Sequence, residues 1–257
     1  MRFASLGSGS NGNALLIQEK TTNILLDCGF GLKDALIRLA RLNISPEELT
    51  GIIVTHEHDD HASGVFKLAL QFNIPIWLTY GTLKMSTRHL PNQANNLIHI
   101  IDSQSRFSID NLSIQPFTVP HDAREPVQYT LHNGVYKLGV LTDVGKSTPH
   151  IIKQLSGCDA LVLECNHDLS MLEKGPYSRS LKKRVSSDLG HLDNKDAAAL
   201  LGKLDNSKLK HIIAAHLSAK NNRPELAQHA LASTLNCEKS WIGIAEQANG
   251  FSWRQLN

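Results

Sequence analysis

The segment "GIIVTHEHDDHASG", Gly51–Gly64, joins a short apolar run to a dense cluster of histidines and aspartates. The run Gly51–Thr55 predicts a buried β-strand, and from Asp60 onward apolar residues recur at helical spacing. Burying imidazoles and carboxylates without partners costs free energy. The cluster at this strand end therefore indicates that these side chains have a binding partner.

The spacing H-x-H-x-D-H favours a metal. His56 and His58 stand two residues apart after the strand, so an extended backbone points both side chains the same way. Asp60 and His61 follow where the helix is expected to begin. Two imidazoles on one side suit one divalent ion, and the aspartate and third histidine can reach a second. The plainer alternative is a set of surface histidines beside a helix-capping aspartate.

Three more polar residues each end an apolar run that predicts a strand. His121 follows "FTVP", Asp143 follows "LGVLT" and His216 follows "HIIAA". Each alone is also a common turn or surface residue. Together with the first motif, they indicate further ligands at one rim of a sheet core.

The composition fits one globular domain over residues 1–257, with 41% hydrophobic and 19% charged residues. A net charge of +2 neither requires nor excludes a nucleic-acid partner. The N-terminus lacks the apolar core of a signal peptide, and no apolar run has transmembrane length, so we expect a cytoplasmic protein. Four cysteines without CxxC spacing argue against a zinc knuckle or a disulfide framework.

The predicted strands come in two batches, and each batch is followed by alternating strands and helices. Two mixed sheets packed face to face, with helices on both outer faces, would bury all of these elements. The last segment, residues 241–255, "WIGIAEQANGFSWRQ", is expected to form a closing β-hairpin.

The order of the polar motifs resembles the metallo-β-lactamase-fold hydrolase superfamily across nearly the whole chain. That resemblance implies the α/β (α+β) class, a four-layer αββα sandwich and a dinuclear metal site at one edge. It assigns the first metal to His56, His58 and His121, the second to Asp60, His61 and His216, and a bridging role to Asp143.

This chain departs from better-known members of that superfamily at two positions, and the second departure argues against electron transfer and for hydrolysis. True β-lactamases carry a cysteine where Asp143 stands, and di-iron redox members place a glutamate ligand where His58 stands. The ligand set suits two divalent ions, either zinc or manganese, with iron possible. A bridging water with a lowered pKa would supply hydroxide near neutral pH, and Asp60 could accept a proton from that water.

Several segments resemble the YycJ/WalJ branch of this superfamily: "GSGSNGN", "VPHDA", "LECNHD", "GHLDNKDAA" and "HLSAKNN". The branch implies a metal-dependent nuclease, with DNA as the substrate and 5′–3′ exonuclease digestion as the expected activity. Asp193 stands where the branch is expected to have a serine, which affects the detail of that loop. Hydrolysis of a thioester, lactone or cyclic phosphodiester is the alternative activity, and a non-catalytic metal-binding module is the other alternative.

His191 is a histidine beyond the expected metal ligands. In tRNA-processing relatives, a similarly placed histidine contacts the scissile phosphate, so His191 is expected to protonate the leaving oxygen. Glu164 ends the predicted strand "ALVLE" and is expected to hold that imidazole in one tautomer and raise its pKa. A helix-capping histidine and a structural carboxylate are the alternatives.

Four residues are expected to contact the substrate. Asn11 and Asn13 lie in "GSGSNGN", which is not a P-loop because the Gly-Lys-Ser/Thr ending is missing. Lys183 lies in the basic segment "SRSLKKRVSS", which can track a phosphate backbone or form a solvated face. Asn221 follows the expected ligand His216 closely. The sequence leaves DNA versus RNA and the oligomeric state open.

Overall fold

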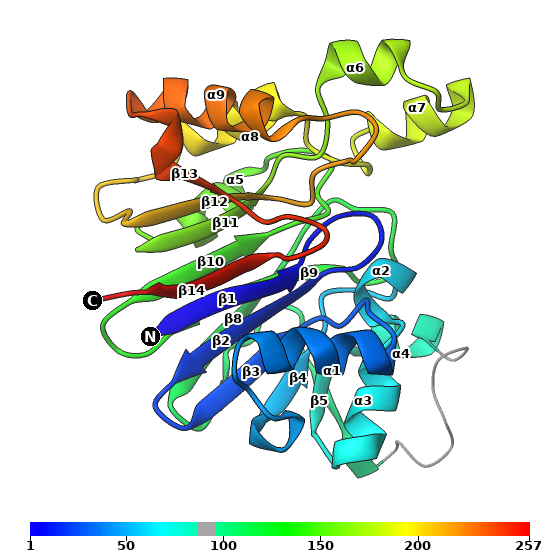
Figure 1. Cartoon of the computed structure of the whole chain (residues 1–257), viewed down its shortest axis with the longest axis vertical. Helices are drawn as coiled ribbons and strands as arrows, with labels where there is room; N and C mark the ends of the chain where they lie inside the picture. The colour runs from blue at the N-terminus through cyan, green and yellow to red at the C-terminus, as the bar shows by residue number, and fades with distance from the viewer. Residues whose placement is uncertain (87–95) are drawn as a thin grey trace.

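The computed structural model describes residues 1–86 and 96–257. Two seven-stranded sheets pack face to face in this part of the chain, and helices cover both outer faces (Figure 1). The expected αββα sandwich of the α/β class is therefore confirmed. In Figure 1, α8 and α9 lie over one outer face, whereas α1 and α3 lie over the other.

The first sheet has the strand order β14-β1-β2-β3-β4-β5-β6. Neighbours are antiparallel from β14 to β3 and parallel from β3 to β6. In that order the strands span Phe251–Gln255, Arg2–Gly7, Ala14–Glu19, Thr22–Leu26, Gly51–Ile53, Ile76–Thr79 and Ile98–Ile101.

The second sheet has the order β13-β12-β11-β10-β9-β8-β7. Its neighbours are antiparallel from β7 to β10 and parallel from β10 to β13. From β7 to β13 the strands span Phe107–Ile109, Leu112–Thr118, Val127–His132, Lys137–Leu141, Ala160–Glu164, His211–Ala215 and Ile242–Ile244.

The helices α1 to α4 belong to the first half of the chain and α5 to α9 to the second. They span Leu32–Arg41, Asp59–Ala62, Val65–Phe72, Tyr80–Met85, Pro149–Leu155, Leu169–Lys174, Arg179–Val185, Asn194–Leu201 and Pro224–Leu235. Short 3-10 turns occupy Pro46–Glu48 and Lys239–Trp241. None of the helices in residues 1–86 and 96–257 is long and apolar enough to cross a membrane.

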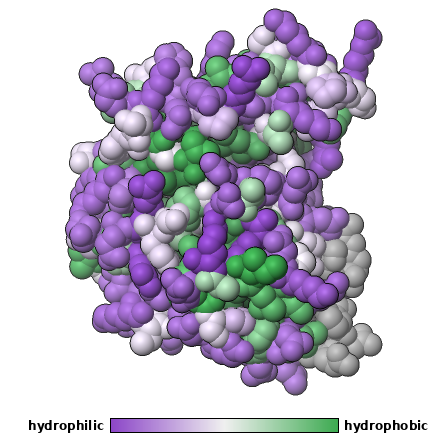
Figure 2. Space-filling view, in the orientation of Figure 1, coloured by the Kyte–Doolittle hydropathy of each residue, from purple (hydrophilic) through white to green (hydrophobic). Residues whose placement is uncertain are grey.

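Three apolar layers hold the four structural layers together. Fully buried side chains such as Phe3 and Tyr129 fill the space between the sheets. Phe66 belongs to the layer between the first sheet and its helices, and Leu231 to the layer between the second sheet and its helices. Burying each such side chain contributes roughly 1.5–3 kcal/mol. On the face shown in Figure 2, hydrophilic residues predominate and hydrophobic ones form small groups.

The prediction that residues 241–255 form a closing β-hairpin is wrong. β13 pairs with β12 in the second sheet, whereas β14 pairs with β1 in the first. The segment between them crosses from one sheet to the other and turns at Gly250, whose φ of 54° suits glycine. Apolar alternation predicted both strands but did not specify their partners. The pattern also does not predict α7, because none of its residues is buried.

Strand direction places the expected ligands at one edge. β8 and β10 are both antiparallel to β9, and β10, β11 and β12 are parallel, so all four end at the same side of the second sheet. In the first sheet, β3 and β4 are parallel. In open sheets, ligands commonly bind beyond the carboxyl ends of such strands.

Candidate metal and catalytic centre

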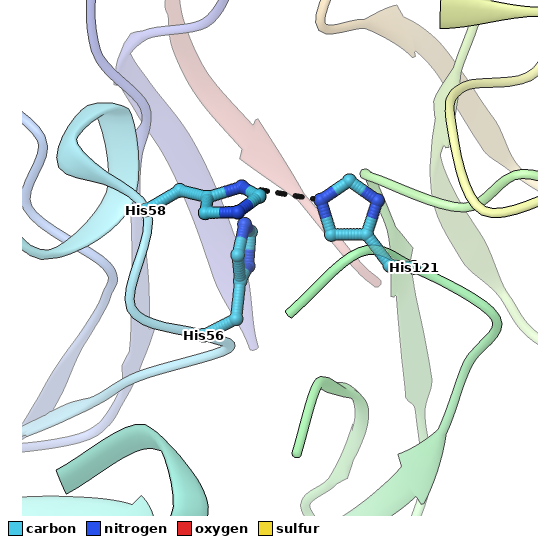
Figure 3. A group of neighbouring side chains, drawn as sticks. All are labelled: His56, His58 and His121. Atoms are coloured by element: carbon cyan, nitrogen blue, oxygen red, sulfur yellow. Dashed lines mark hydrogen bonds between the residues drawn. The ribbon is translucent and has the colours of Figure 1, made fainter. Parts of the chain in front are cut away.

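His56, His58 and His121 form one candidate metal group, because each offers a ligand atom within 4.8 Å of the others. Figure 3 shows the three rings converging, two from the segment after β4 and one from the segment after β8. His58 Nδ1 lies 3.3 Å from His121 Nε2. His56 Nε2 is buried without a hydrogen-bond partner in the described part of the chain. Facing imidazole nitrogens and a buried orphan nitrogen suit a bound cation.

Asp60, His61, Asp143 and His216 form a second group within the same 4.8 Å limit. His61 Nε2 lies 2.9 Å from Asp143 Oδ2, and His216 Nε2 lies 3.3 Å from Asp60 Oδ2. Asp143 Oδ1 is also 3.9 Å from His121 Nε2 in the first group. Asp143 therefore belongs to the second group and also has one carboxylate oxygen near the first group, so it could contact ions in both.

Three of these imidazoles are oriented by acceptors outside the two groups. In each case Nδ1 donates a hydrogen bond, which leaves Nε2 facing the group. The pairs are His61 Nδ1 with Asp27 Oδ2 at 2.7 Å, His216 Nδ1 with Glu164 Oε1 at 3.0 Å and His121 Nδ1 with the Gly190 carbonyl at 3.1 Å. This arrangement is typical of histidines that bind metal.

Backbone contacts fix the start of α2, which carries two of the second group. The Asn13 N–H donates to the Asp60 carbonyl at 2.7 Å, and the Cys28 N–H donates to the His61 carbonyl at 2.8 Å. A Cβ at Gly29 would lie only 1.9 Å from the Asp60 carbonyl oxygen. Glycine at position 29 therefore permits the close approach that positions Asp60.

Asp27 is a buried carboxylate that the sequence reasoning missed. Its oxygens accept hydrogen bonds at 2.8 Å from the Thr55 N–H and hydroxyl, and it also holds His61. The Thr55 hydroxyl lies 2.9 Å from His56 Nδ1, so Asp27 supports both metal groups. Burial raises the pKa of Asp27, although His61 opposes that shift. Asp27 directly follows the apolar strand β3, which is the same signal that identified Asp143.

Three strand ends share an uncommon backbone conformation. Asp27, Asp143 and His216 have φ values of 60°, 54° and 55°. Left-handed φ is uncommon outside glycine, and each such residue costs about 1–3 kcal/mol. Strain of this kind concentrates at functional sites, and here it turns the chain sharply where three site residues are presented.

Glu164 is a fully buried carboxylate that contacts several site residues. It accepts hydrogen bonds from the backbone N–H groups of Asp143 (3.1 Å), Val144 (3.0 Å) and Leu192 (3.1 Å), and it also faces the Nδ1 atoms of His191 (2.8 Å) and His216 (3.0 Å). Burial opposes the charge, but the facing imidazoles and the donors outweigh it and hold the pKa of Glu164 at about 2. The carboxylate therefore stays ionised and orients both histidines.

His191 lines a cavity of about 370 Å³ together with His58, Asp60 and His216. Its side chain is 21% exposed. Burial opposes protonation, but the charge and hydrogen bond of Glu164 outweigh burial and raise the pKa of His191. The proton of this imidazolium is therefore retained at higher pH than in a free histidine.

The ligand histidines differ in their proton affinity. Burial lowers the pKa of His56 and of His121, so both are neutral, as metal binding requires. For His216, burial also opposes the charge, but Asp143, Asp60 and Glu164 outweigh it and raise its pKa to about 10. A metal that binds there must displace a proton.

None of the four expected substrate contacts is among the described residues that line the cavity. Asn13 is buried, and its amide nitrogen lies 3.1 Å from His61 Nε2. Asn11 is exposed, and its N–H donates to Gln247. Lys183 is exposed on α7, and Asn221 is fully buried. Their role in substrate binding stays a prediction.

Comparisons with known proteins agree with this geometry. A family model described as the beta-lactamase superfamily domain matches residues 22–216. Exodeoxyribonuclease YycJ of Bacillus anthracis is 35% identical over 251 residues, which cover 96% of this chain and 92% of that protein. Exodeoxyribonuclease WalJ of Streptococcus pneumoniae is 31% identical over 245 residues, which cover 95% of this chain and 91% of that protein.

Among solved structures, the metallo-beta-lactamase fold protein YhfI from Bacillus subtilis superposes with a TM-score of 0.75 and covers 99% of both chains. At 14% identity this likeness concerns the fold alone. The family match spans most of the chain, and the two bacterial relatives match it nearly end to end. The chain therefore belongs to the beta-lactamase superfamily, in the branch that contains the YycJ and WalJ proteins.

Proposed function

We propose that this metal-dependent hydrolase cleaves phosphodiester bonds at the ends of DNA, as a 5′–3′ exonuclease that uses two divalent cations. One observation carries the proposal: His191, which Glu164 holds at 2.8 Å, lies 3.5 Å from Asp143 of the second group and lines the same cavity as His58 of the first group. The names of the relatives YycJ and WalJ support DNA as the substrate.

The two groups fit cations by their own chemistry. His56, His58 and His121 would hold one ion, whereas Asp60, His61 and His216 would hold the other, with Asp143 between them. Nitrogen and carboxylate ligands suit zinc or manganese, and also iron. When bound, two such ions supply an activated water and neutralise charge on the attacked phosphate.

The protein's own residues would handle the protons. Burial opposes ionisation of Asp60, but His61 and His216 lower its pKa, so a carboxylate faces the cavity and can accept a proton from water. Glu164 holds His191 through Nδ1, which leaves Nε2 for the leaving oxygen of the substrate. Although burial opposes protonation, the charge and hydrogen bond of Glu164 raise the pKa of His191, which favours retention of the proton that the donor needs.

The test uses purified protein loaded with Mn²⁺ or Zn²⁺. End-labelled single-stranded and duplex DNA are incubated with it, and a thioester is assayed in parallel. We expect DNA hydrolysis that depends on the added metal and is abolished by a chelator. Thioester turnover without DNA cleavage under either metal would refute the nuclease proposal and leave a small-molecule hydrolase.

A further inference from the structure

The cavity beside the metal groups is lined by two chemically different sets of residues. Part of its lining consists of the candidate ligands and His191, and another part consists of Tyr177, Leu181, Arg184 and Val185. Residues 181, 184 and 185 lie on α7, and Tyr177 immediately precedes the helix cap at Ser178. Positions three and four apart share one helix face, so these side chains form a continuous strip.

Tyr177 adds an aromatic ring to the cavity lining, beside the apolar side chains of Leu181 and Val185. The ring is only partly buried, and Lys220 Nζ lies 5.8 Å from its centroid. Because α7 has no buried residue, the side chains of the strip are not buried against the core and can contact a ligand. Aromatic rings in positively charged grooves are the usual platforms for stacked nucleic-acid bases.

Arg184 supplies one positive charge to a cavity lining that also carries the four aspartates Asp59, Asp60, Asp122 and Asp143. It is the one lysine or arginine among the described residues that line this cavity. Its Nε donates to Asp122 Oδ2 at 2.6 Å, and Asp122 Oδ1 lies 3.5 Å from His121 Nε2. Asp122 therefore holds the guanidinium close to the metal groups, and the remaining N–H groups of Arg184 stay available for a phosphate.

We infer that the strip Tyr177–Val185 is the subsite for the terminal nucleotide, with Tyr177 stacking on its base and Arg184 contacting a phosphate. This inference rests on the proposed nuclease function. At about 370 Å³ the cavity lies near the lower end of ligand pockets, which span roughly 300–1,000 Å³. It therefore suits one nucleotide of a chain end and not a duplex.

The first experiment combines Tyr177 variants with a substrate that lacks the base. Tyr177→Ala and Tyr177→Phe are assayed on an oligonucleotide and on the same chain with an abasic terminal nucleotide. Stacking acts in ground and transition states alike, so Tyr177→Ala should raise KM about tenfold, within roughly 5- to 150-fold, with little change in kcat. Tyr177→Phe keeps the ring and should match the wild type. On the abasic substrate, Tyr177→Ala should also match the wild type.

The second experiment measures binding without turnover, by fluorescence anisotropy of internally labelled single-stranded DNA in metal-free buffer. Arg184→Ala should lower the slope of log affinity against log salt by about 0.7, the value for one lost phosphate contact on a single strand. Arg106→Ala, which removes an exposed arginine outside the cavity, should leave the slope unchanged.

The outcomes separate the two proposals. If the wild type cleaves no DNA with any added metal, the proposed function fails. If the wild type cleaves DNA but Tyr177→Ala leaves the KM ratio of the two substrates unchanged, only the nucleotide subsite is overturned. An equal salt slope for Arg184→Ala and wild type overturns the phosphate contact.

Discussion

Replacing Glu164 with glutamine perturbs the buried carboxylate that joins His191 to His216. The two side chains have nearly the same shape, but one acceptor oxygen becomes an NH₂ donor. In the native site both oxygens accept: Oε1 faces the Asp143 N–H and both imidazoles, whereas Oε2 faces two other backbone N–H groups. Whichever way the amide turns, its NH₂ must face a backbone donor.

The size of the effect follows from the pKa of Glu164, which is about 2 in the fold against an ordinary 4.5. A difference of about 2.5 units corresponds to roughly 3 kcal/mol of stabilisation at neutral pH. Because the folded-state pKa is the lower one, this stabilisation is complete above about pH 4.5 and is lost as pH falls towards 2. The unfavourable contact between the amide NH₂ and a backbone N–H adds a further loss of stability, and this loss does not depend on pH.

The assay is urea unfolding of metal-free protein, followed by circular dichroism at pH 7 and pH 3. Glu164→Gln should lose about 3 kcal/mol or more at pH 7, and the difference from wild type should shrink by roughly 2 kcal/mol at pH 3. Glu173→Gln, which alters an exposed side chain on α6, is the control and should change stability by less than about 0.5 kcal/mol. A difference below about 1 kcal/mol at pH 7, or one of equal size at both pH values, would refute the reasoning.

Four further predictions concern activity and metal. In Glu164→Gln the alkaline limb of the pH–rate profile should move to lower pH, because the carboxylate no longer raises the pKa of the proton donor His191. His191→Ala should lower kcat by roughly 10²- to 10⁴-fold, with the metal content unchanged by mass spectrometry. Metal binding at pH 7 should release protons, because the pKa of His216 is about 10 without metal, and the apparent affinity should therefore fall as pH is lowered; calorimetry in two buffers measures this release. Asp27→Asn should weaken metal binding by roughly 10- to 100-fold in competition with a chelator.

Each of these has an outcome that contradicts it. Lost metal in His191→Ala would make that residue a ligand. If the alkaline limb of the pH–rate profile stays at the same pH in Glu164→Gln, the carboxylate does not raise the pKa of the proton donor. Metal binding at pH 7 without proton release would mean that His216 is neutral before the metal arrives. Unchanged affinity in Asp27→Asn would leave its contacts with His61 and Thr55 purely structural.

The positions of His121, Asp143 and His216 were predictable because each one ends an apolar run. Parallel strands bring such ends to one edge, so the sequence alone groups these three residues with the first motif. The contact between His191 and Glu164 was also expected, and the structure places their atoms 2.8 Å apart. The residues at strand ends therefore predicted contacts between positions that are far apart in the sequence.

Other features were not predictable from local pattern. Asp27 ends an apolar run as Asp143 does, so its position was readable, but its contacts with His61 and Thr55 arise only in the folded chain. The strands β13 and β14 look like a hairpin, and only their pairing with distant strands separates them. Asn13 looks like an exposed loop residue, yet backbone contacts from α2 bury it.

The most direct test of the central claim is a time course of the products that metal-loaded protein releases from 5′-labelled DNA. A two-metal exonuclease that starts at the 5′ end should release the labelled mononucleotide at the first time points, while the remaining strand shortens gradually. Intact DNA at all times with Mn²⁺ and with Zn²⁺, from protein that hydrolyses a thioester, would contradict the account.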